Sequence, residues 1–392
     1  MSGLVGTFLC LGNPLLDIAA VVDDAFLAKH DIKLANQILA EPQHMPIYQE
    51  LAALPTVEYM AGGAGQNTTR VVQWLMQVPH ATTYMGCIGD DEFGRKMSAT
   101  ASSAGVNVRH LVDAATVRYL VDAATVTTTL IPTLRAPAGP PPGRRSHRHH
   151  YPDPNPLCPP QVRHLVDAAT VRYLVDAATP TGTCAVCVVG GERSLVANLA
   201  AANNYKTEHV LLPENFSLVE AARIIYCTGF FITVSPDSIA LVAKHCAEHD
   251  KIFAMNISAP FIVQVPPFKK VLSDSLPYVD YLFGNETEAA AFAESEGYSG
   301  ADLQEVARRV SRMPKASGAR PRTVVFTQGA DCTIVAVGGK VTLYPTTLVE
   351  KSKLILAGKG VPEAVRAGNY AASTVIQHSG CVFPATPSFC WE

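Results

Sequence analysis

Short apolar runs rich in β-branched residues alternate along this chain with longer segments whose apolar positions recur every three or four residues. The short runs predict buried strands, and the longer segments, such as 238–249 and 301–313, predict amphipathic helices. Regular alternation of the two predicts a layered α/β fold. The predicted strands are Thr7–Gly12, Thr83–Gly86, Ile224–Cys227, Ile252–Asn256, Tyr281–Phe283 and Thr323–Thr327.

Polar and glycine residues follow most of these strands. Because the carboxyl ends of parallel strands meet at one edge of a sheet, where α/β proteins bind ligands, we expect these loops to define one cleft. The loops are Gly12–Asn13, Gly229–Phe230, Asn256, Gly284–Asn285 and Thr327–Gly329.

Two segments interrupt the pattern. An 18-residue sequence occupies Val108–Thr125 and recurs unchanged at Val162–Thr179, and each copy is itself two nine-residue repeats. Nine residues rotate a helix by half a turn, so a helix through both repeats would be apolar all round. Between the copies, Val126–Gln161 holds ten prolines and almost no acidic residue. We expect this stretch to be an extended, non-catalytic insertion.

Composition narrows the class of protein. The 392 residues are 48% hydrophobic and 17% charged, with 31 basic and 34 acidic side chains and a net charge of −3. The chain is therefore globular, has no basic footprint for nucleic acid, and lacks a membrane-spanning run, so a small-molecule partner is expected. Ten cysteines without framework spacing favour the reducing cytosol, and additional residence in the nucleus is also compatible with them.

The N-terminal 22 residues lack a basic region and include Asn13, Pro14 and Asp17, so they predict a first pair of strands rather than a signal peptide. Asp17 stands in the apolar run LLDIAAVV, where an unpaired carboxylate would be costly. Asp17 either caps a local turn or accepts hydrogen bonds from the hydroxyl groups of a sugar. Further on, Gly62 and Gly63 precede a helical pattern, where glycines let backbone N–H groups approach a ligand.

The segment Gly284–Glu288 closes a strand and starts a helix. Asn285 or Thr287 could simply cap that helix; alternatively Asn285 contacts a phosphate oxygen and Glu288 a metal-bound water. Cys184 and Cys187 form a CxxC in a strand-like run, which sends them to opposite faces and argues against a redox or zinc site. The histidines at 147, 149 and 150 lie in the insertion, and Trp74 and Leu75 are expected in the core.

The order of these motifs resembles the ribokinase (PfkB) carbohydrate kinase family over almost the whole chain outside the insertion. Motifs that carry the resemblance are GNPLLDI at 12–18, NQILAE at 36–41, AGGAGQN at 61–67, GCIGDDEFG at 86–94, TGTCAVCV at 181–188, RSLVANLAAAN at 193–203, GFFITVSP at 229–236, NISAPF at 256–261, FGNETEAA at 283–290, FTQG at 326–329, GNYAAS at 368–373 and GCVFP at 380–384.

The resemblance implies a three-layer α/β/α large domain with a small β-sheet lid. The expected large domain comprises residues 1–13, 46–125 and 205–392, the lid comprises 14–45 and 180–204, and residues 126–179 hold the insertion and the duplicated segment. It also implies a monomer.

The resemblance further implies transfer of the γ-phosphoryl group of ATP, with Mg²⁺, to the 5′-hydroxyl of adenosine, giving AMP in purine salvage. Asp17 would hold the ribose hydroxyls with Asn13, Gly62, Gly63 and Asn67. Arg193 would reach from the lid to the phosphates, and Glu288 would organise the Mg²⁺. The remaining residues wall the nucleoside (Gln37, Cys184, Leu195, Ala197, Phe231) or contact the nucleotide (Asn285, Thr327, Gly329).

One departure from the family is large. Its signature D-T-x-G-A-G-D should precede the GNYAAS helix, but the chain has no aspartate after Asp331. That signature supplies the base for the 5′-hydroxyl, and losing a general base lowers the rate by about 10² to 10⁴. We therefore expect this chain to be inactive or impaired. Gly358–Gly360 with Glu363 could stand in for the loop, and the alternatives are a non-catalytic nucleoside-binding protein or a kinase for another nucleoside or sugar.

Overall fold

The computed structural model describes residues 6–34, 36–95, 97, 111–113, 116–119, 170–190, 192–298, 300–318, 320–329, 331–345, 370, 371, 374, 381, 383, 384 and 387. The proline-rich stretch and its histidines lie outside these residues. So does the segment 346–369, where the family signature is absent from the sequence.

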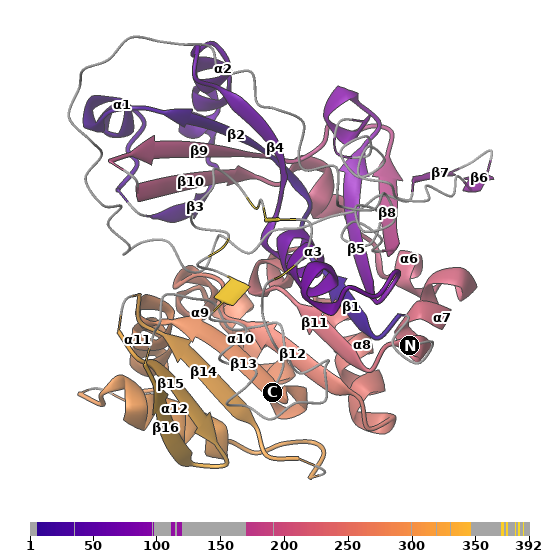
Figure 1. The fold of residues 1–392 in the computed structure, drawn as a ribbon, viewed down its shortest axis with the longest axis vertical. Coiled ribbons are helices and arrows are strands. Elements are labelled where there is room, and N and C mark those ends of the chain that lie inside the picture. Colours follow the sequence, from indigo (N-terminus) through magenta and orange to yellow (C-terminus); the bar gives the residue numbers. More distant parts are fainter. Residues whose placement is uncertain are drawn as a thin grey trace.

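A mixed sheet of eleven described strands forms the body of the molecule (Figure 1). Its parallel centre confirms the α/β prediction, and three predicted strands have the bounds that the sequence pattern gave them: β11, β12 and β14. In spatial order the strands are β16 (Lys340–Tyr344), β15 (Thr333–Val337), β14 (Thr323–Thr327), β13 (Tyr281–Asn285), β12 (Ile252–Asn256), β11 (Ile224–Cys227), β1 (Phe8–Leu11), β5 (Thr82–Gly89), β8 (Thr170–Asp176), β7 (Thr116–Tyr119) and β6 (Leu111–Asp113).

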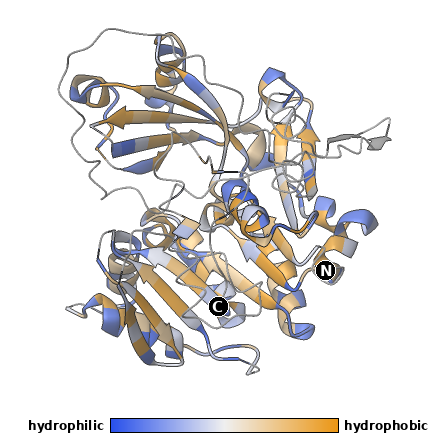
Figure 2. Ribbon diagram, viewed as in Figure 1, coloured by the Kyte–Doolittle hydropathy of each residue, from blue (hydrophilic) through white to orange (hydrophobic). Residues whose placement is uncertain are grey.

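Helices cover both faces of this sheet. One face packs against helices from the second half of the chain through a core that includes Ile239, Leu272 and Val306, and the other face packs against α3 (Ala64–Met76). Figure 2 shows the hydrophobic residues concentrated in the strands between these layers. The helices on the first face are α6 (Thr207–Leu211), α7 (Pro213–Ala221), α8 (Pro236–Glu248), α9 (Phe261–Gln264), α10 (Pro266–Ser275), α11 (Glu286–Ser295) and α12 (Leu303–Arg312).

A second sheet of five strands forms the lid. Alternate side chains give it two apolar faces: Ile18, Ala185 and Cys187 pack under the short helices α1 (Asp24–Lys29) and α2 (Pro46–Ala52), whereas Leu15 and Cys184 belong to the other face. The CxxC cysteines thus lie on opposite faces, as predicted. The strand order is β3 (Gln37–Leu39), β10 (Glu192–Asn198), β9 (Thr183–Val189), β2 (Leu15–Val21) and β4 (Glu58–Gly62).

The observed sheets differ from the predicted domain boundaries in two places. Residues 170–176, which the sequence analysis assigned to the duplicated segment, form β8 and pair in parallel with β5, because Val171 and Tyr173 supply buried side chains. Residues 58–62, assigned to the large domain, pair with β2 in the lid. The predicted first pair, β1 and β2, is split between the two sheets. No helix among the described residues has the length and apolar character that a membrane span requires.

Candidate active site

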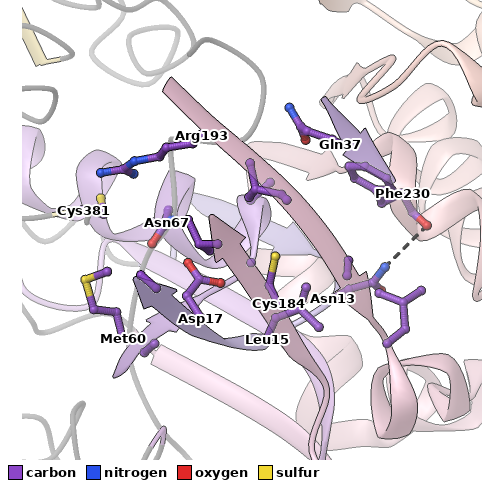
Figure 3. Close-up of a pocket in the computed structure, with 18 of the residues that line it drawn as sticks. Asn13, Leu15, Asp17, Gln37, Met60, Asn67, Cys184, Arg193, Phe230 and Cys381 are labelled. Carbon is purple, nitrogen blue, oxygen red and sulfur yellow. Dashed lines mark hydrogen bonds between the residues drawn. The ribbon is translucent and has the colours of Figure 1, made fainter. Parts of the chain in front are cut away.

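A pocket opens where the lid meets the carboxyl edge of the large sheet (Figure 3). It encloses about 990 Å³ of space, which includes the open solvent at its mouth. The lid contributes one wall, the N-terminus of α3 another, and the loops after β1 and β11 contribute Asn13, Thr228 and Phe230. The loop residues Asn13 and Phe230 thus share one cleft, as expected from the strand order.

Asp17 is the only acidic side chain among the described residues that line this pocket. It lies on β2, opposite Met60 of β4 and Cys184 of β9. Burial raises the pKa of its carboxyl group to about 7, and the positive charge of Arg193 partly offsets that rise. The carboxylate lies against Gly62, where an added Cβ would come within 2.1 Å of Asp17 Oδ1. Gly62 therefore does not line the pocket itself but makes room for the group that does.

Two asparagines accompany Asp17. Asn13 and Asn67 are 6% and 2% exposed, and the Oδ1 atom of each has no hydrogen-bond partner in the part of the chain that the structure describes. The Nδ2 group of Asn13 donates to the carbonyl of Phe230 at 3.4 Å. Buried polar atoms without partners are uncommon, so these two oxygens point to a ligand that carries hydrogen-bond donors.

Gly63 brings the two asparagines together. Its φ of +99° favours glycine, and a Cβ there would lie 2.3 Å from the carbonyl oxygen of Asn13. The residue is the N-cap of α3, whose first turns carry Ala64 and Asn67 into the pocket.

The rest of the wall is mostly apolar. Cys184, Leu195 and Ala197 line the pocket from β9 and β10, and Gln37 lines it from β3, as the sequence analysis expected. Phe231 does not: it is fully buried in the core of the large domain, 5.3 Å from the ring of Tyr205. Its neighbour Phe230 lines the pocket instead, because the 3₁₀ turn Gly229–Thr233 directs successive side chains to different sides.

Arg193 lies on β10 and projects into the same pocket. Burial lowers the pKa of its guanidinium group, whereas the charges of Asp17 and Glu58 raise it. The described residues that line the pocket therefore include one carboxyl group and one cation, each influenced by the other.

The residues predicted to contact the nucleotide lie outside this pocket. Asn285 is the N-cap of α11: its Oδ1 accepts a hydrogen bond from the Glu288 backbone N–H at 2.8 Å, and Glu288 Oε2 accepts one from the Asn285 N–H at 3.2 Å. Asn285 thus caps α11, which is one of the possibilities that the sequence left open. Thr327 pairs with Asn285 at the same sheet edge, and its buried Oγ1 has no partner among the described residues. Gly329 follows with a φ of +52°.

Glu288 is the acidic group at this edge that could serve a metal ion. It is 1% exposed, and burial raises its pKa to about 8. The described residues contain no group of three potential metal ligands. One carboxylate fits Mg²⁺, which keeps several waters and takes its other ligands from substrate phosphates, better than it fits a metal held by protein alone.

Sequence reasoning missed several pocket residues, including Met60 and Cys381. The alternation of β4 could have indicated Met60, which lies opposite Asp17. Nothing in the local sequence around Cys381 signals a pocket position, because its place depends on how the C-terminal segment packs.

Comparisons with known proteins agree with this geometry. A model described as pfkB family carbohydrate kinase matches residues 24–137 and 165–355. The chain is 45% identical to Adenosine kinase 1 of Arabidopsis thaliana, covering 98% of each, and 34% identical to the Adenosine kinase of Dictyostelium discoideum, covering 96% of each.

Solved structures of adenosine kinases are also similar to this chain. The chain is similar to Anopheles gambiae adenosine kinase in complex with P1,P4-di(adenosine-5) tetraphosphate (TM-score 0.76, 35% identity, 98% and 99% of the two chains). It is also similar to adenosine kinase from Schistosoma mansoni in complex with adenosine and AMP (TM-score 0.77, 25% identity, 98% and 99%).

Proposed function

This chain belongs to the pfkB family of carbohydrate kinases, and we propose that its pocket binds adenosine and presents the 5′-hydroxyl group to the γ-phosphoryl group of ATP. Full-length relatives named adenosine kinases support this choice of acceptor. The Anopheles structure was solved with a ligand that joins two adenosines through four phosphates, which matches a site that accommodates an acceptor nucleoside and a nucleotide together.

The observation that carries the proposal is the arrangement of Asp17, Asn13 and Asn67. A carboxylate and two buried amide oxygens without partners among the described residues provide acceptors for the neighbouring 2′- and 3′-hydroxyl groups of a ribose. The apolar wall, with Phe230 and Leu195, suits a purine base better than it suits a free sugar.

The charge of the phosphates would be neutralised at the other end of the site. Arg193 would meet the transferring phosphates, while Asn285, Thr327 and Gly329 would contact the nucleotide. Mg²⁺ would be held by the ATP phosphates and, through water, by Glu288, and it would supply compensation for the charge that develops on the transferred group. Positioning and electrostatics account for most of the catalysis of phosphoryl transfer.

We also propose that the transfer step is impaired in this chain. The family's acidic signature is absent from the sequence, and no aspartate follows Asp331. Asn13, Asp17 and Asn67 line the pocket of this chain, so nucleoside binding should survive the loss of the base. A protein that binds adenosine with little turnover is therefore the form of the proposal that this chain supports best.

Calorimetric titration tests the binding proposal. Adenosine should bind to the full chain, ribose should bind at least tenfold more weakly, and Asp17→Asn should weaken adenosine binding at least tenfold, because charge-assisted hydrogen bonds contribute about 1.5–3 kcal/mol each. Equal affinity for adenosine and ribose, or an Asp17→Asn variant that binds normally, would contradict it.

A further inference from the structure

The C-terminal segment contributes a residue to the pocket although it is far away in sequence. Cys381 is 6% exposed and lines the same cavity as Asp17 and Arg193. In Figure 3 its thiol lies at the end of the pocket where Arg193 and Met60 are drawn, away from Gln37 and Phe230. If Gln37 and Phe230 hold the base, Cys381 borders the end where the 5′-hydroxyl group must lie.

An aromatic contact fixes this segment on α3. The ring of Phe383 stacks on Trp74 with centroids 4.9 Å apart and planes 25° apart. The guanidinium carbon of Arg70 lies 5.4 Å from the centre of the same ring. A third contact comes from Tyr370, which stacks on Trp74 at 5.7 Å and 15°.

The face of α3 that receives Phe383 is the face that forms the pocket. Asn67, Arg70 and Trp74 stand at positions i, i+3 and i+7, which lie along one side of a helix. Asn67 and Arg70 are separated by about 4.5 Å along the helix axis, and Cys381 is only two residues from Phe383 in the sequence. A chain held at Phe383 over Arg70 and Trp74 can therefore place Cys381 beside the N-terminal turn that carries Asn67.

We propose that Phe383 is a positioning residue, whose stack on Trp74 and contact with Arg70 hold Cys381 as the wall of the nucleoside pocket at its 5′-hydroxyl end. The inference rests on the proposed function, since it assigns one end of that pocket. Phe383 does not touch the nucleoside. It acts by fixing both the C-terminal segment and the helix that bears Asn67.

The test measures adenosine affinity by calorimetry in the full chain. Phe383→Ala should weaken adenosine binding about three- to tenfold, the size expected when an aromatic contact is lost. Phe383→Tyr, which retains the ring and its contact with Arg70, should bind nearly as well as the parent. Pro384→Ala changes the exposed neighbouring residue and should leave affinity unchanged. A Phe383→Ala variant that folds and binds like the parent would overturn the proposal.

A measurement on the unaltered chain covers the case in which Phe383→Ala does not fold. Alkylation by iodoacetamide, followed by peptide mapping, should show that adenosine slows the modification of Cys381 but not that of Cys332, which lies outside the pocket. Absence of adenosine binding to the parent chain would refute the proposed function. Binding without protection of Cys381 would refute only this inference.

Discussion

At the residue scale, the site depends on the carboxyl group of Asp17, which is buried although burial disfavours its ionised form. Asp17 lies on a lid strand between Met60 and Cys184, and burial raises its pKa to about 7. Such a group is held ready for a ligand whose donors favour the ionised form. Its affinity for a diol should consequently depend on pH within the neutral range.

The affinity for adenosine should decrease at acidic pH. Because the ionised carboxylate is the better acceptor, adenosine binding should release a proton near neutral pH and weaken as the pH falls below about 7, by about tenfold one unit below the pKa. Calorimetry at pH 6, 7 and 8 in buffers of different ionisation enthalpy measures both quantities. Proton uptake on binding, or an affinity independent of pH, would be incompatible with this role for Asp17.

Gly62 offers a second test at this scale. A Cβ at this position would overlap the Asp17 carboxyl group, with contacts of 2.1 to 2.5 Å, so Gly62→Ala should displace that group and weaken adenosine binding at least tenfold. Gly318→Ala is the matched control, because a Cβ there meets nothing within 4 Å. Equal affinities of the two variants would show that the close approach is unimportant.

Sequence reasoning identified residues whose type reveals their role but not those whose role depends on packing. Asp17 could be predicted because a carboxylate in an apolar run needs a partner. Phe230 and Phe231 are identical in type, and only the 3₁₀ turn decides which of them faces the pocket. Cys381 could not be predicted, because a stack between Phe383 and Trp74, more than 300 residues apart, brings it there.

At the element scale, the start of α11 combines a structural and a proposed binding role. The reciprocal hydrogen bonds of Asn285 and Glu288 form a capping box. Asn285→Ala should therefore lower the free energy of unfolding by about 1 kcal/mol and also weaken ATP binding. Chemical denaturation and nucleotide titration measure the two effects.

Asp302 provides the control for this variant. It caps α12 through the backbone N–H of Glu305 at 2.7 Å and lies outside the pocket. Asp302→Ala should cost about the same stability while ATP affinity stays unchanged. If both variants bind ATP equally, Asn285 is a helix cap and nothing more.

Glu288 should make stability depend on pH. Its pKa in the folded protein is about 8, above the ordinary value of 4.5, so the folded state holds an extra proton between these values and loses stability as the pH rises. Glu288→Gln should therefore gain stability relative to the parent from pH 5 to pH 9 in urea unfolding. Glu305→Gln should not gain in this way, because Arg309 and Arg308 lower the pKa of Glu305. The same trend in both variants would contradict the assignment.

Element positions were predictable where apolar runs are bounded by turn residues, as for β11, β12 and β14. Prediction failed for β8, because its sequence is repeated elsewhere in the chain and the repeat obscured which copy pairs with β5. It also failed for β4, which contains exposed Glu58 and Tyr59 and joins the lid only through pairing with β2.

At the scale of the whole molecule, we propose that nucleoside binding and phosphoryl transfer are separable. Among the described residues, the lid, α3 and Cys381 all contribute to the pocket. The acid that the family uses for transfer is missing from the sequence. Loss of a general base lowers a rate by about 10² to 10⁴ without necessarily affecting substrate affinity.

The most direct test compares phosphoryl transfer with binding in the same preparation. Transfer from γ-labelled ATP to adenosine should be at least 10²-fold slower than with Arabidopsis thaliana Adenosine kinase 1 assayed alongside, while calorimetry detects adenosine binding to both proteins. Transfer at the rate of the Arabidopsis enzyme would contradict the account, because it would mean that another residue of this chain performs the work of the missing acid.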